Sequence, residues 1–576
     1  MKRVLLLSAM VSCTVLFATS LFGQKPVNKL VTDNTCNGLQ EKVLRQGAAA
    51  EGPRAGADRQ GQRAVELQTK ADGQGAAAEG LRAGADRQGT DVTGENCFAI
   101  IAGKNTTTDG SVMFGHNEDD SGEQMLNVYI VPAGTQPATT EGGLKIPASI
   151  ANGYAVGDKN NPGSEGKQRT NGKFIWCEFP GMSVADAAMN QWGVAIASDG
   201  CNSREDRDDF TDGGILYDVR MNVAKYARTA REAVKIIGEA VEQYGYKGSG
   251  RTYSVADPEE GWIVAVVKGR HWVAQRVPDD KVMILPNYYT ITNVNLEDTA
   301  NFMGSPDIID YAISRGWYDP HSRQEFNFRL AYADPATIER ASNRTRHKAV
   351  IEYVTGGSDN YDPYSVQPMF TPAKKLSVAD MISMLSIHNE KEDPQKIIGA
   401  PEQPARGHLD PSHIPGVCTN VTIVSTIFQL RNWMPKETGC VMWMCPGRPC
   451  ANVYVPWTLG MTEVPEGWAR YDDWQEAEQH HFSDATDKEK NYPEHPYWFF
   501  TKRWNKLNSN YIYWIKDVQD KKWQMQYDIF KSYTELQKSL PKKLKKSKNR
   551  KQAEQMLNQF TADTYKKILS QKSIKP

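Results

Sequence analysis

Short apolar runs separated by turn residues dominate the chain from Phe98 onward. The runs at 98–102 and 112–115 are strand-like, and the segment between them contains Asp109-Gly110, a strong hairpin signal. Segment 419–455 fits strand and helix patterns equally. Hairpins that alternate with long helices predict an α+β protein built in layers. Further strands are expected at 261–267, 271–277 and 281–285, and helices at 184–190, 219–244 and 306–314.

The chain before Cys97 has a different texture. A short positive region precedes an apolar run diluted by Ser and Thr, so residues 1–23 are expected to be a secretory signal peptide, with a retained membrane anchor as the alternative. The segment 46–61 recurs almost letter for letter at 74–89 and is poor in large apolar residues. We therefore expect 24–96 to be a low-complexity propeptide or linker. The signal predicts an exported protein, periplasmic or extracellular, without stable membrane insertion after its removal.

Composition and charge narrow the classes of partner. The chain has 68 Lys and Arg against 69 Asp and Glu, a net charge of −1, so no nucleic-acid partner is expected. The 14 Trp, 24 Tyr and 17 Phe indicate a well-packed globular body. Segment 536–576 is rich in Lys and is expected to be a solvated helical tail, with binding to an anionic partner as the alternative.

The number of cysteines suggests that one thiol stays outside the disulfides. Cys13 and Cys36 lie in segments expected to be removed, which leaves an odd number. One free thiol at Cys97 and up to three disulfides would suit an exported protein. No metal is expected, because the five-residue spacing among the last three cysteines does not fit a zinc ribbon. The remaining cysteines are Cys97, Cys177, Cys201, Cys418, Cys440, Cys445 and Cys450.

Cys97 opens the first segment that reads as folded core. A cut before it would create an N-terminal cysteine, which carries a nucleophilic thiol and an α-amine of pKa about 7.7–8.0. A two-residue turn at Asp109-Gly110 would place Cys97 opposite position 122, and a turn centred near Thr107 would place it opposite 118. Either register brings Asp119 near Cys97, where it could orient the amine or the thiol. The alternative is an exposed acidic loop over 118–120.

Several blocks in order resemble peptidase family C69, which includes the secernins and the bacterial dipeptidase A type. The first block is Cys97, Gly103-Lys104, Asp109-Gly110-Ser111 and Asn117-Glu118-Asp119. Later blocks are Asn190-Gln191-Trp192-Gly193-Val194, Asp257-Pro258-Glu259-Glu260-Gly261-Trp262, Gly269-Arg270-His271-Trp272, Phe302-Met303-Gly304-Ser305-Pro306-Asp307, Gly316-Trp317-Tyr318, His388-Asn389-Glu390, Gln429-Leu430-Arg431 and Tyr454-Val455-Pro456-Trp457. The resemblance covers about residues 97 to 470.

The resemblance implies a fold and a reaction. The fold would be a four-layer αββα N-terminal-nucleophile hydrolase sandwich over 97–535, followed by the basic helical tail. Cys97 Sγ would attack a peptide carbonyl, and water would hydrolyse the resulting thioester. The substrates would be short peptides, dipeptides above all, and no metal or organic cofactor is expected. A homo-oligomer is compatible with this expectation.

The remaining site candidates also come from the resemblance. Asn287 follows an apolar strand and is expected to donate to the oxyanion, with a turn asparagine as the alternative. Asp199 or Ser198 is a weaker candidate donor. Arg344 is assigned as the distal supporting arginine, with Arg346 as the alternative. Many members of the family carry an arginine three residues before the acidic residue, where this chain has His116. Because histidine is positively charged only below its pKa, a permanent positive charge beside Cys97 is not assured in this chain.

Other mechanisms lack their signatures. No CGSCW-like sequence surrounds Cys97, so His388 gives no papain-like pair, and HExxH, GxSxG, phosphate-loop and dinucleotide patterns are absent. Two alternatives to a dipeptidase remain at this point. One is an N-acyl amide hydrolase of the penicillin-acylase or bile-salt-hydrolase type with the same centre. The other is a non-catalytic exported binding protein in which Cys97 is a buried thiol.

Overall fold

The computed structural model describes the chain from Cys97 onward with several gaps. The expected signal peptide, the duplicated segment and the Asn96–Cys97 boundary lie outside the described residues. The described residues all belong to one structural unit. They are 97–120, 125–134, 171–179, 185–207, 209–211, 213–216, 218–357, 361–388, 416–470, 488–509, 511–540 and 547–571.

One antiparallel sheet begins at Phe98, directly after Cys97. Its strands run in the order β12-β10-β1-β2-β13-β14-β15. Phe98 pairs with Asn117, which places Cys97 opposite position 118, so the turn centred near Thr107 is the correct one. The strands are β1 (Phe98–Ala102), β2 (Val112–Asp119), β10 (Val282–Leu285), β12 (Met369–Phe370), β13 (Thr422–Leu430), β14 (Cys440–Pro446) and β15 (Val455–Thr458).

A second antiparallel sheet has the order β11-β9-β8-β7-β6-β5-β4-β3. The helix expected at 184–190 is wrong, because this segment is β5 and pairs with strands on both sides. Sheet pairing and burial there outweigh the helix preference of its alanines. The strands are β3 (Asn127–Val131), β4 (Phe174–Glu178), β5 (Ala185–Asn190), β6 (Ala195–Gly200), β7 (Tyr246–Ala256), β8 (Gly261–Gly269), β9 (Trp272–Val277) and β11 (Phe302–Gly304).

The two sheets pack face to face around the main core. A Cβ atom added to Gly261 of β8 would lie 2.5 Å from the Ile101 side chain, so this contact between sheets requires glycine. On the opposite face of the first sheet, a Cβ atom on Gly115 would lie 2.9 Å from Met381 in a covering helix. Both faces of β1 and β2 are therefore covered, which explains why every residue of these strands is buried.

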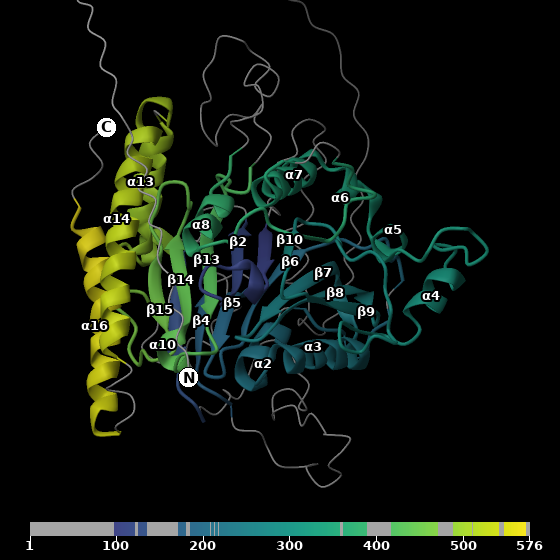
Figure 1. Ribbon diagram of the computed structural model, residues 1–576, viewed down its shortest axis with the longest axis horizontal. Helices are drawn as coiled ribbons and strands as arrows, with labels where there is room; N and C mark the ends of the chain where they lie inside the picture. Colours follow the sequence, from purple (N-terminus) through teal and green to yellow (C-terminus); the bar gives the residue numbers. More distant parts are fainter. Residues whose placement is uncertain are drawn as a thin grey trace, which may run out of the picture. The chain divides into compact units, whose positions relative to one another are not determined.

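Helices cover the outer faces of both sheets (Figure 1). The helices α2 (Asp218–Tyr226) and α3 (Ala230–Tyr244) pack on the second sheet, whereas α7 (Ala341–Thr355) and α8 (Val378–Leu385) pack on the first. This arrangement confirms the α+β prediction and gives the expected order of helix, sheet, sheet and helix. The shorter helices are η1 (Lys104–Thr106), α4 (Ile308–Ser314), α5 (Phe328–Tyr332), α6 (Pro335–Glu339), α10 (Lys436–Gly439) and α12 (Lys488–Asn491).

The helix expected over 219–244 is interrupted after Tyr226. Thr229 is the N-cap of α3, and its hydroxyl accepts a hydrogen bond of 3.1 Å from the backbone N–H of Glu232. The cap satisfies one of the otherwise unpaired N–H groups of the first turn. It also redirects the chain, so that two helices rather than one cover the second sheet.

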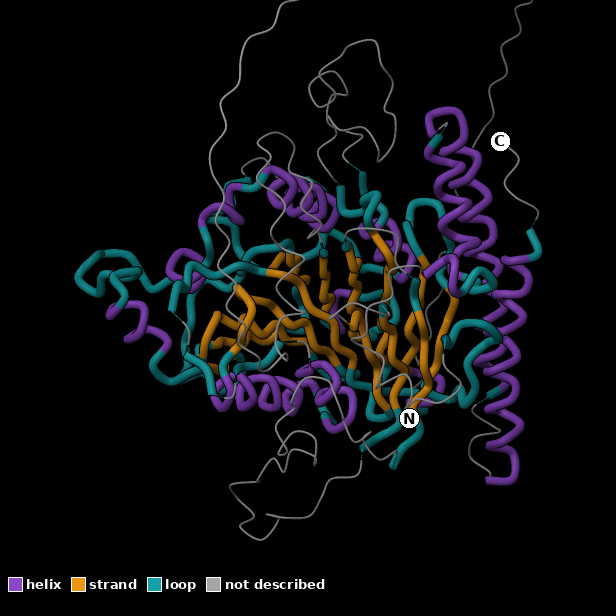
Figure 2. Tube along the Cα trace, turned by 180° about the vertical axis from the view of Figure 1, so that it is seen from behind, coloured by secondary structure: helices purple, strands orange, loops and turns teal. Residues whose placement is uncertain are grey.

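Three C-terminal helices stand along the β15 edge of the first sheet (Figures 1 and 2). They are α13 (Tyr497–Asn508), α14 (Tyr511–Ser539) and α16 (Ser547–Leu569). The last segment is helical as expected, but it is not a solvated tail. Tyr565 of α16 is buried and accepts a hydrogen bond of 3.0 Å from the Trp457 indole. Among the described residues, no helix combines the length and apolar composition needed to cross a membrane.

The cysteines differ from the expectation of up to three disulfides. All seven cysteines from Cys97 to Cys450 are buried, and none of them forms a disulfide within the described residues. Cys177, Cys201, Cys440 and Cys445 lie in the sheets or next to them, where a buried thiol packs as a small apolar side chain.

Candidate active site

The Cys97 thiol lies at the start of β1, inside the protein. Its side chain is 5% exposed, and Sγ lies 3.5 Å from Glu118 Oε1 and 3.6 Å from the Asp119 carbonyl oxygen. Both contacts follow from the β1–β2 register, which sets position 118 opposite Cys97. Burial raises the pKa of the thiol well above its usual value, and the charges of Glu118, Asp199 and Asp119 raise it further.

A buried carboxylate of the second sheet lies near Cys97 and approaches His116. His116 of β2 lies with Nε2 3.9 Å from Glu118 Oε2 and 3.7 Å from Asp199 Oδ1. Asp199 comes from β6 of the second sheet and is completely buried. Burial raises the pKa of Asp199 to about 7, while His116 acts in the opposite direction. The thiol therefore has ionisable neighbours from both sheets.

Asp119 lies beside Cys97, as the hairpin prediction required. Its carbonyl oxygen faces the thiol, whereas its carboxylate accepts a hydrogen bond of 2.5 Å from the Thr419 hydroxyl. Burial raises the pKa of Asp119 to about 6, and the hydrogen bond from Thr419 opposes that rise. Glu118 and Asp119 are 3% and 2% exposed, so the alternative of an exposed acidic loop is wrong.

Arg346 of α7 holds the backbone of Cys97. Its Nη1 donates a hydrogen bond of 3.0 Å to the Cys97 carbonyl oxygen, and its Nη2 donates to the side-chain oxygens of Asn287 at 2.8 Å and Asn343 at 2.6 Å. The guanidinium is completely buried. Burial lowers the pKa of Arg346 to about 10, and Asp119 acts in the opposite direction. It thus places a positive charge behind the nucleophile.

The position of Arg346 decides between the two arginines of α7. The buried residues of this helix follow a helical stripe that includes Asn343, Arg346 and Val350, whereas Arg344 is exposed. The residue that contacts Cys97 is therefore Arg346, and Arg344 was the wrong choice. The apolar stripe from Val350 to Val354 marks this buried face in the sequence.

Asn287 lies within the same network. Its side-chain oxygen accepts from Arg346, and its side-chain N–H donates a hydrogen bond of 3.0 Å to the Gly200 carbonyl oxygen at the end of β6. The carbonyl oxygen of Asn287 accepts from the Asn343 side chain at 3.2 Å. These bonds fix the amide between β6 and α7, close to the residue that anchors Cys97.

Two of the remaining candidates lie differently. Ser198 of β6 accepts a hydrogen bond of 3.1 Å from Arg251, so the member of the Ser198–Asp199 pair near Cys97 is Asp199. His388 bonds Tyr511 and lies in another group of residues.

Sequence reasoning missed the thiol contact of Glu118 and the role of Asn343. The register with position 118 opposite Cys97, and the three-residue spacing of Asn343 and Arg346 on one helix, were the available signals.

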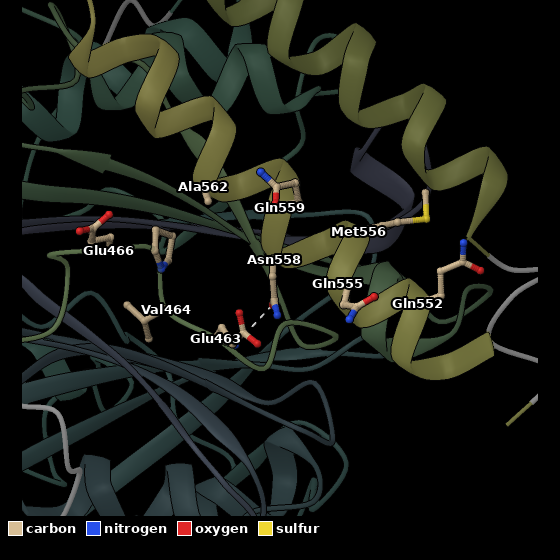
Figure 3. A pocket seen from close by; sticks show the side chains of 10 residues that line it. Glu463, Val464, Glu466, Gln552, Gln555, Met556, Asn558, Gln559 and Ala562 are labelled. Carbon is tan, nitrogen blue, oxygen red and sulfur yellow. Dashed lines mark hydrogen bonds between the residues drawn. The ribbon is translucent and has the colours of Figure 1, made fainter. Parts of the chain in front are cut away.

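A pocket of about 680 Å³ lies far from this chemistry, between segment 463–466 and α16 (Figure 3). Asn558 anchors its wall, because its side-chain oxygen accepts from the backbone N–H of Thr462 at 2.9 Å and of Glu463 at 3.3 Å. Its lining contains amides, carboxylates and apolar groups but no cysteine, serine or histidine. It therefore offers no nucleophile, and Cys97 remains the candidate centre.

The amino-acid sequence of this chain matches a known protein family. The model of peptidase family C69 matches residues 96–520, most of the chain. The chain belongs to peptidase family C69. Family C69 membership makes the protein a peptidase, and the matched region begins one residue before Cys97.

Individual relatives agree with the C69 assignment. A probable dipeptidase of Salmonella dublin is 26% identical over 386 residues, covering 64% of this chain and 82% of the relative. Dipeptidase A of Lactobacillus helveticus is 25% identical over 387 residues, covering 65% and 77% of the two chains. Among solved structures, penicillin V acylase from Agrobacterium tumefaciens matches with a TM-score of 0.27 and 13% identity over 61% of this chain and 82% of that one.

Proposed function

We propose that this C69 peptidase is an exported dipeptidase that uses Cys97 as an N-terminal nucleophile. The observation that carries the proposal is the placement of Cys97. Its thiol faces Glu118 at 3.5 Å, while Arg346 holds its carbonyl oxygen at 3.0 Å. The two relatives above are named as dipeptidases, which supports dipeptides as the substrate class. The apolar run in residues 1–23 supports export.

The reaction has two stages. Cys97 Sγ attacks the peptide carbonyl carbon, and the thiol proton passes to the leaving amine as the C–N bond breaks. The acyl group is then held as a thioester. Water attacks the thioester, releases the acid product and returns the proton to sulfur. The free α-amine of Cys97 serves as the base in both stages, because its ordinary pKa of about 7.7–8.0 is close to neutral.

The neighbouring residues have separate tasks. Asn287 has a second side-chain N–H besides the one that donates to Gly200, and this second donor would bind the oxyanion. Arg346 positions Cys97 and adds positive charge near the oxyanion. Asp119 and Glu118 would hold the α-ammonium between turnovers. Glu118 would do so through its carboxylate and Asp119 through its backbone carbonyl oxygen, the atoms that lie 3.5 Å and 3.6 Å from the Cys97 thiol.

The proposal requires a cut between Asn96 and Cys97. In the uncut chain, burial and three carboxylates raise the pKa of the thiol. A new α-ammonium on Cys97 would oppose this effect, since an opposite charge within about 4–6 Å favours the ionised thiol. Cutting would therefore supply the base and make the nucleophile easier to ionise. Cys97 attack on the Asn96 carbonyl would perform the cut, and an external protease would give the same product.

A substrate comparison tests the proposal. Purified protein that begins at Cys97 would be assayed with a set of dipeptides and with N-acyl amides, beside Cys97→Ala. We expect dipeptide hydrolysis that disappears in the variant, together with labelling of one thiol per chain at Cys97 by a thiol reagent. Faster turnover of N-acyl amides than of dipeptides would mean that the Cys97 centre acts on acyl amides instead. Unchanged dipeptide turnover in Cys97→Ala would remove Cys97 from the mechanism.

A further inference from the structure

A second group of reactive side chains lies away from Cys97. One potential ligand atom from each of His388, Cys418 and Cys450 lies within 4.8 Å of the others. His388 follows α8, Cys418 precedes β13, and Cys450 lies in the loop between β14 and β15. The spacing of cysteines along the chain did not reveal this group, because its members come from three separate segments.

The surroundings hold these side chains in place. Cys418 and Cys450 are 1% and 0% exposed, and they share a small core with Trp504 and Tyr511 of the C-terminal helices. The Tyr511 hydroxyl lies 2.7 Å from His388 Nδ1. An outer hydrogen bond of this kind fixes the ring orientation of histidines that bind metals. The group thus combines two buried thiols with an oriented imidazole.

A buried lysine lies beside the group. Lys522 of α14 is 2% exposed, and its ammonium donates to the carbonyl oxygen of Pro449, next to Cys450. Burial lowers the pKa of Lys522, while Cys445, Cys450 and Cys418 act in the opposite direction. The lysine therefore holds the loop that carries Cys450 against α14.

We propose that His388, Cys418 and Cys450 bind one zinc-like divalent cation. Two thiolates and an imidazole match the preference of zinc, which takes sulfur at about 2.3 Å and nitrogen at about 2.0–2.1 Å. Such ligands lie about 3.3–3.8 Å apart around a tetrahedral ion, so side chains now within 4.8 Å need only small rotations to close on it. Binding releases one proton from each thiol, and water completes the coordination.

The site would have a structural role. The ion would join the end of α8, the start of β13 and the β14–β15 loop, and a hydrogen bond from His388 Nδ1–H to the Tyr511 hydroxyl would connect it to α14. The ion would stabilise the folded chain without touching the substrate, although Cys418 adjoins Thr419, whose hydroxyl binds the Asp119 carboxylate. The proposal therefore stands independently of the proposed function.

Metal analysis of the full chain tests this site. The protein would be stripped with a chelator, reloaded with Zn²⁺ and desalted, beside Cys418→Ser, Cys450→Ser and the nearby control Cys445→Ser. We expect about one zinc per chain in the wild type and the control and almost none in the other two variants. The Cys97→Ala variant should keep its zinc, which separates this site from the peptidase centre.

Two measurements on the wild type keep the test independent of variant folding. Reloading with Co²⁺ should give thiolate-to-cobalt charge-transfer absorption, and stripping should lower the melting temperature reversibly. Zinc retained equally by all variants, or no zinc after reloading, would overturn the proposal. So would a Cys418–Cys450 disulfide found by mass spectrometry in the untreated protein, because it would consume both thiols.

Discussion

Arg346 donates a hydrogen bond of 3.0 Å to the carbonyl oxygen of Cys97, a residue 249 positions earlier in the chain. The bond ties the buried face of α7 to the residue directly before β1. Because it acts on the backbone, it fixes the Cα position from which the thiol projects. The same guanidinium binds Asn287 and Asn343, so one buried cation links the nucleophile to the proposed oxyanion donor.

Arg346→Ala should therefore lose both activity and stability. Its removal leaves the Cys97 carbonyl and two amide oxygens without their donor, in a fully buried place. We expect kcat/KM to fall at least 100-fold and the free energy of unfolding to fall by about 3–5 kcal/mol, the usual cost of breaking a buried charged network. Steady-state assays and urea unfolding would measure the two effects.

Arg344→Ala is the matched control for this variant. Arg344 is two positions away on the same helix but exposed, so its loss should change stability by no more than about 0.5 kcal/mol. Dipeptide turnover should stay close to that of the wild type. Equal losses in the two variants would contradict the assignment of Arg346 as the supporting arginine.

Asn287→Ala should act mainly on kcat. An oxyanion donor binds charge that exists only in the transition state, and removal of such a donor costs about 10²–10³ in kcat with little effect on KM. Asn343→Ala removes another partner of Arg346 without touching the proposed donor. Similar kcat losses in both variants would show that Asn287 only positions Arg346.

Asp199 should make the uncut protein less stable at higher pH. Its pKa is about 7 in the folded protein against an ordinary value of 3.8, so folding favours its protonated form. The contribution to stability is present below about pH 4 and is lost as the pH rises through 7. Asp199→Asn imitates the protonated form, and it should be more stable than its parent at pH 8 by about 1–4 kcal/mol, at about 1.4 kcal/mol per pKa unit.

The pH comparison is best made in the uncut Cys97→Ala background. Urea unfolding at pH 4, 6 and 8 would show the difference growing with pH. Asp280→Asn, at an exposed position, is the control and should show no such trend. A stability difference that shrinks from pH 4 to pH 8 would contradict the burial effect at Asp199.

The last helix should contribute to stability. Leu557 of α16 is 1% exposed and packs against Gly460, where an added Cβ atom would lie 2.4 Å from it. Leu557→Ala should lower the free energy of unfolding by about 2–5 kcal/mol, the usual range for a buried leucine. Lys551→Ala on the exposed face should change it by less than about 0.5 kcal/mol. Equal effects in denaturant unfolding would mean that α16 is not packed in solution.

Local patterns predicted the elements near Cys97 better than those farther away. The hairpin of β1 and β2 depends on a turn and on apolar residues close in sequence, so its pairing could be narrowed to two registers. Segment 185–190 depends on pairing with β4 and β6, which no local signal contains, and it was predicted as a helix. The capping Thr229 was readable in the sequence, yet the long apolar pattern concealed the break that it marks.

The candidate site was predictable where residues are neighbours on one element. Asp119 could be placed by strand register, and the buried stripe of α7 could have chosen Arg346 over Arg344. The approach of Asp199 to His116 joins two different sheets, and it required the folded structure. The same is true of the His388, Cys418 and Cys450 group, whose members come from three separate segments of the chain.

The central claim is that Cys97 acts as an N-terminal nucleophile. Its most direct test is intact mass and N-terminal sequencing of the exported protein, combined with dipeptide turnover, for the wild type and Cys97→Ala. The account predicts a wild-type chain that begins at Cys97 and hydrolyses dipeptides, and an inactive variant. A wild-type chain that retains residues before Cys97 and still hydrolyses dipeptides would contradict it.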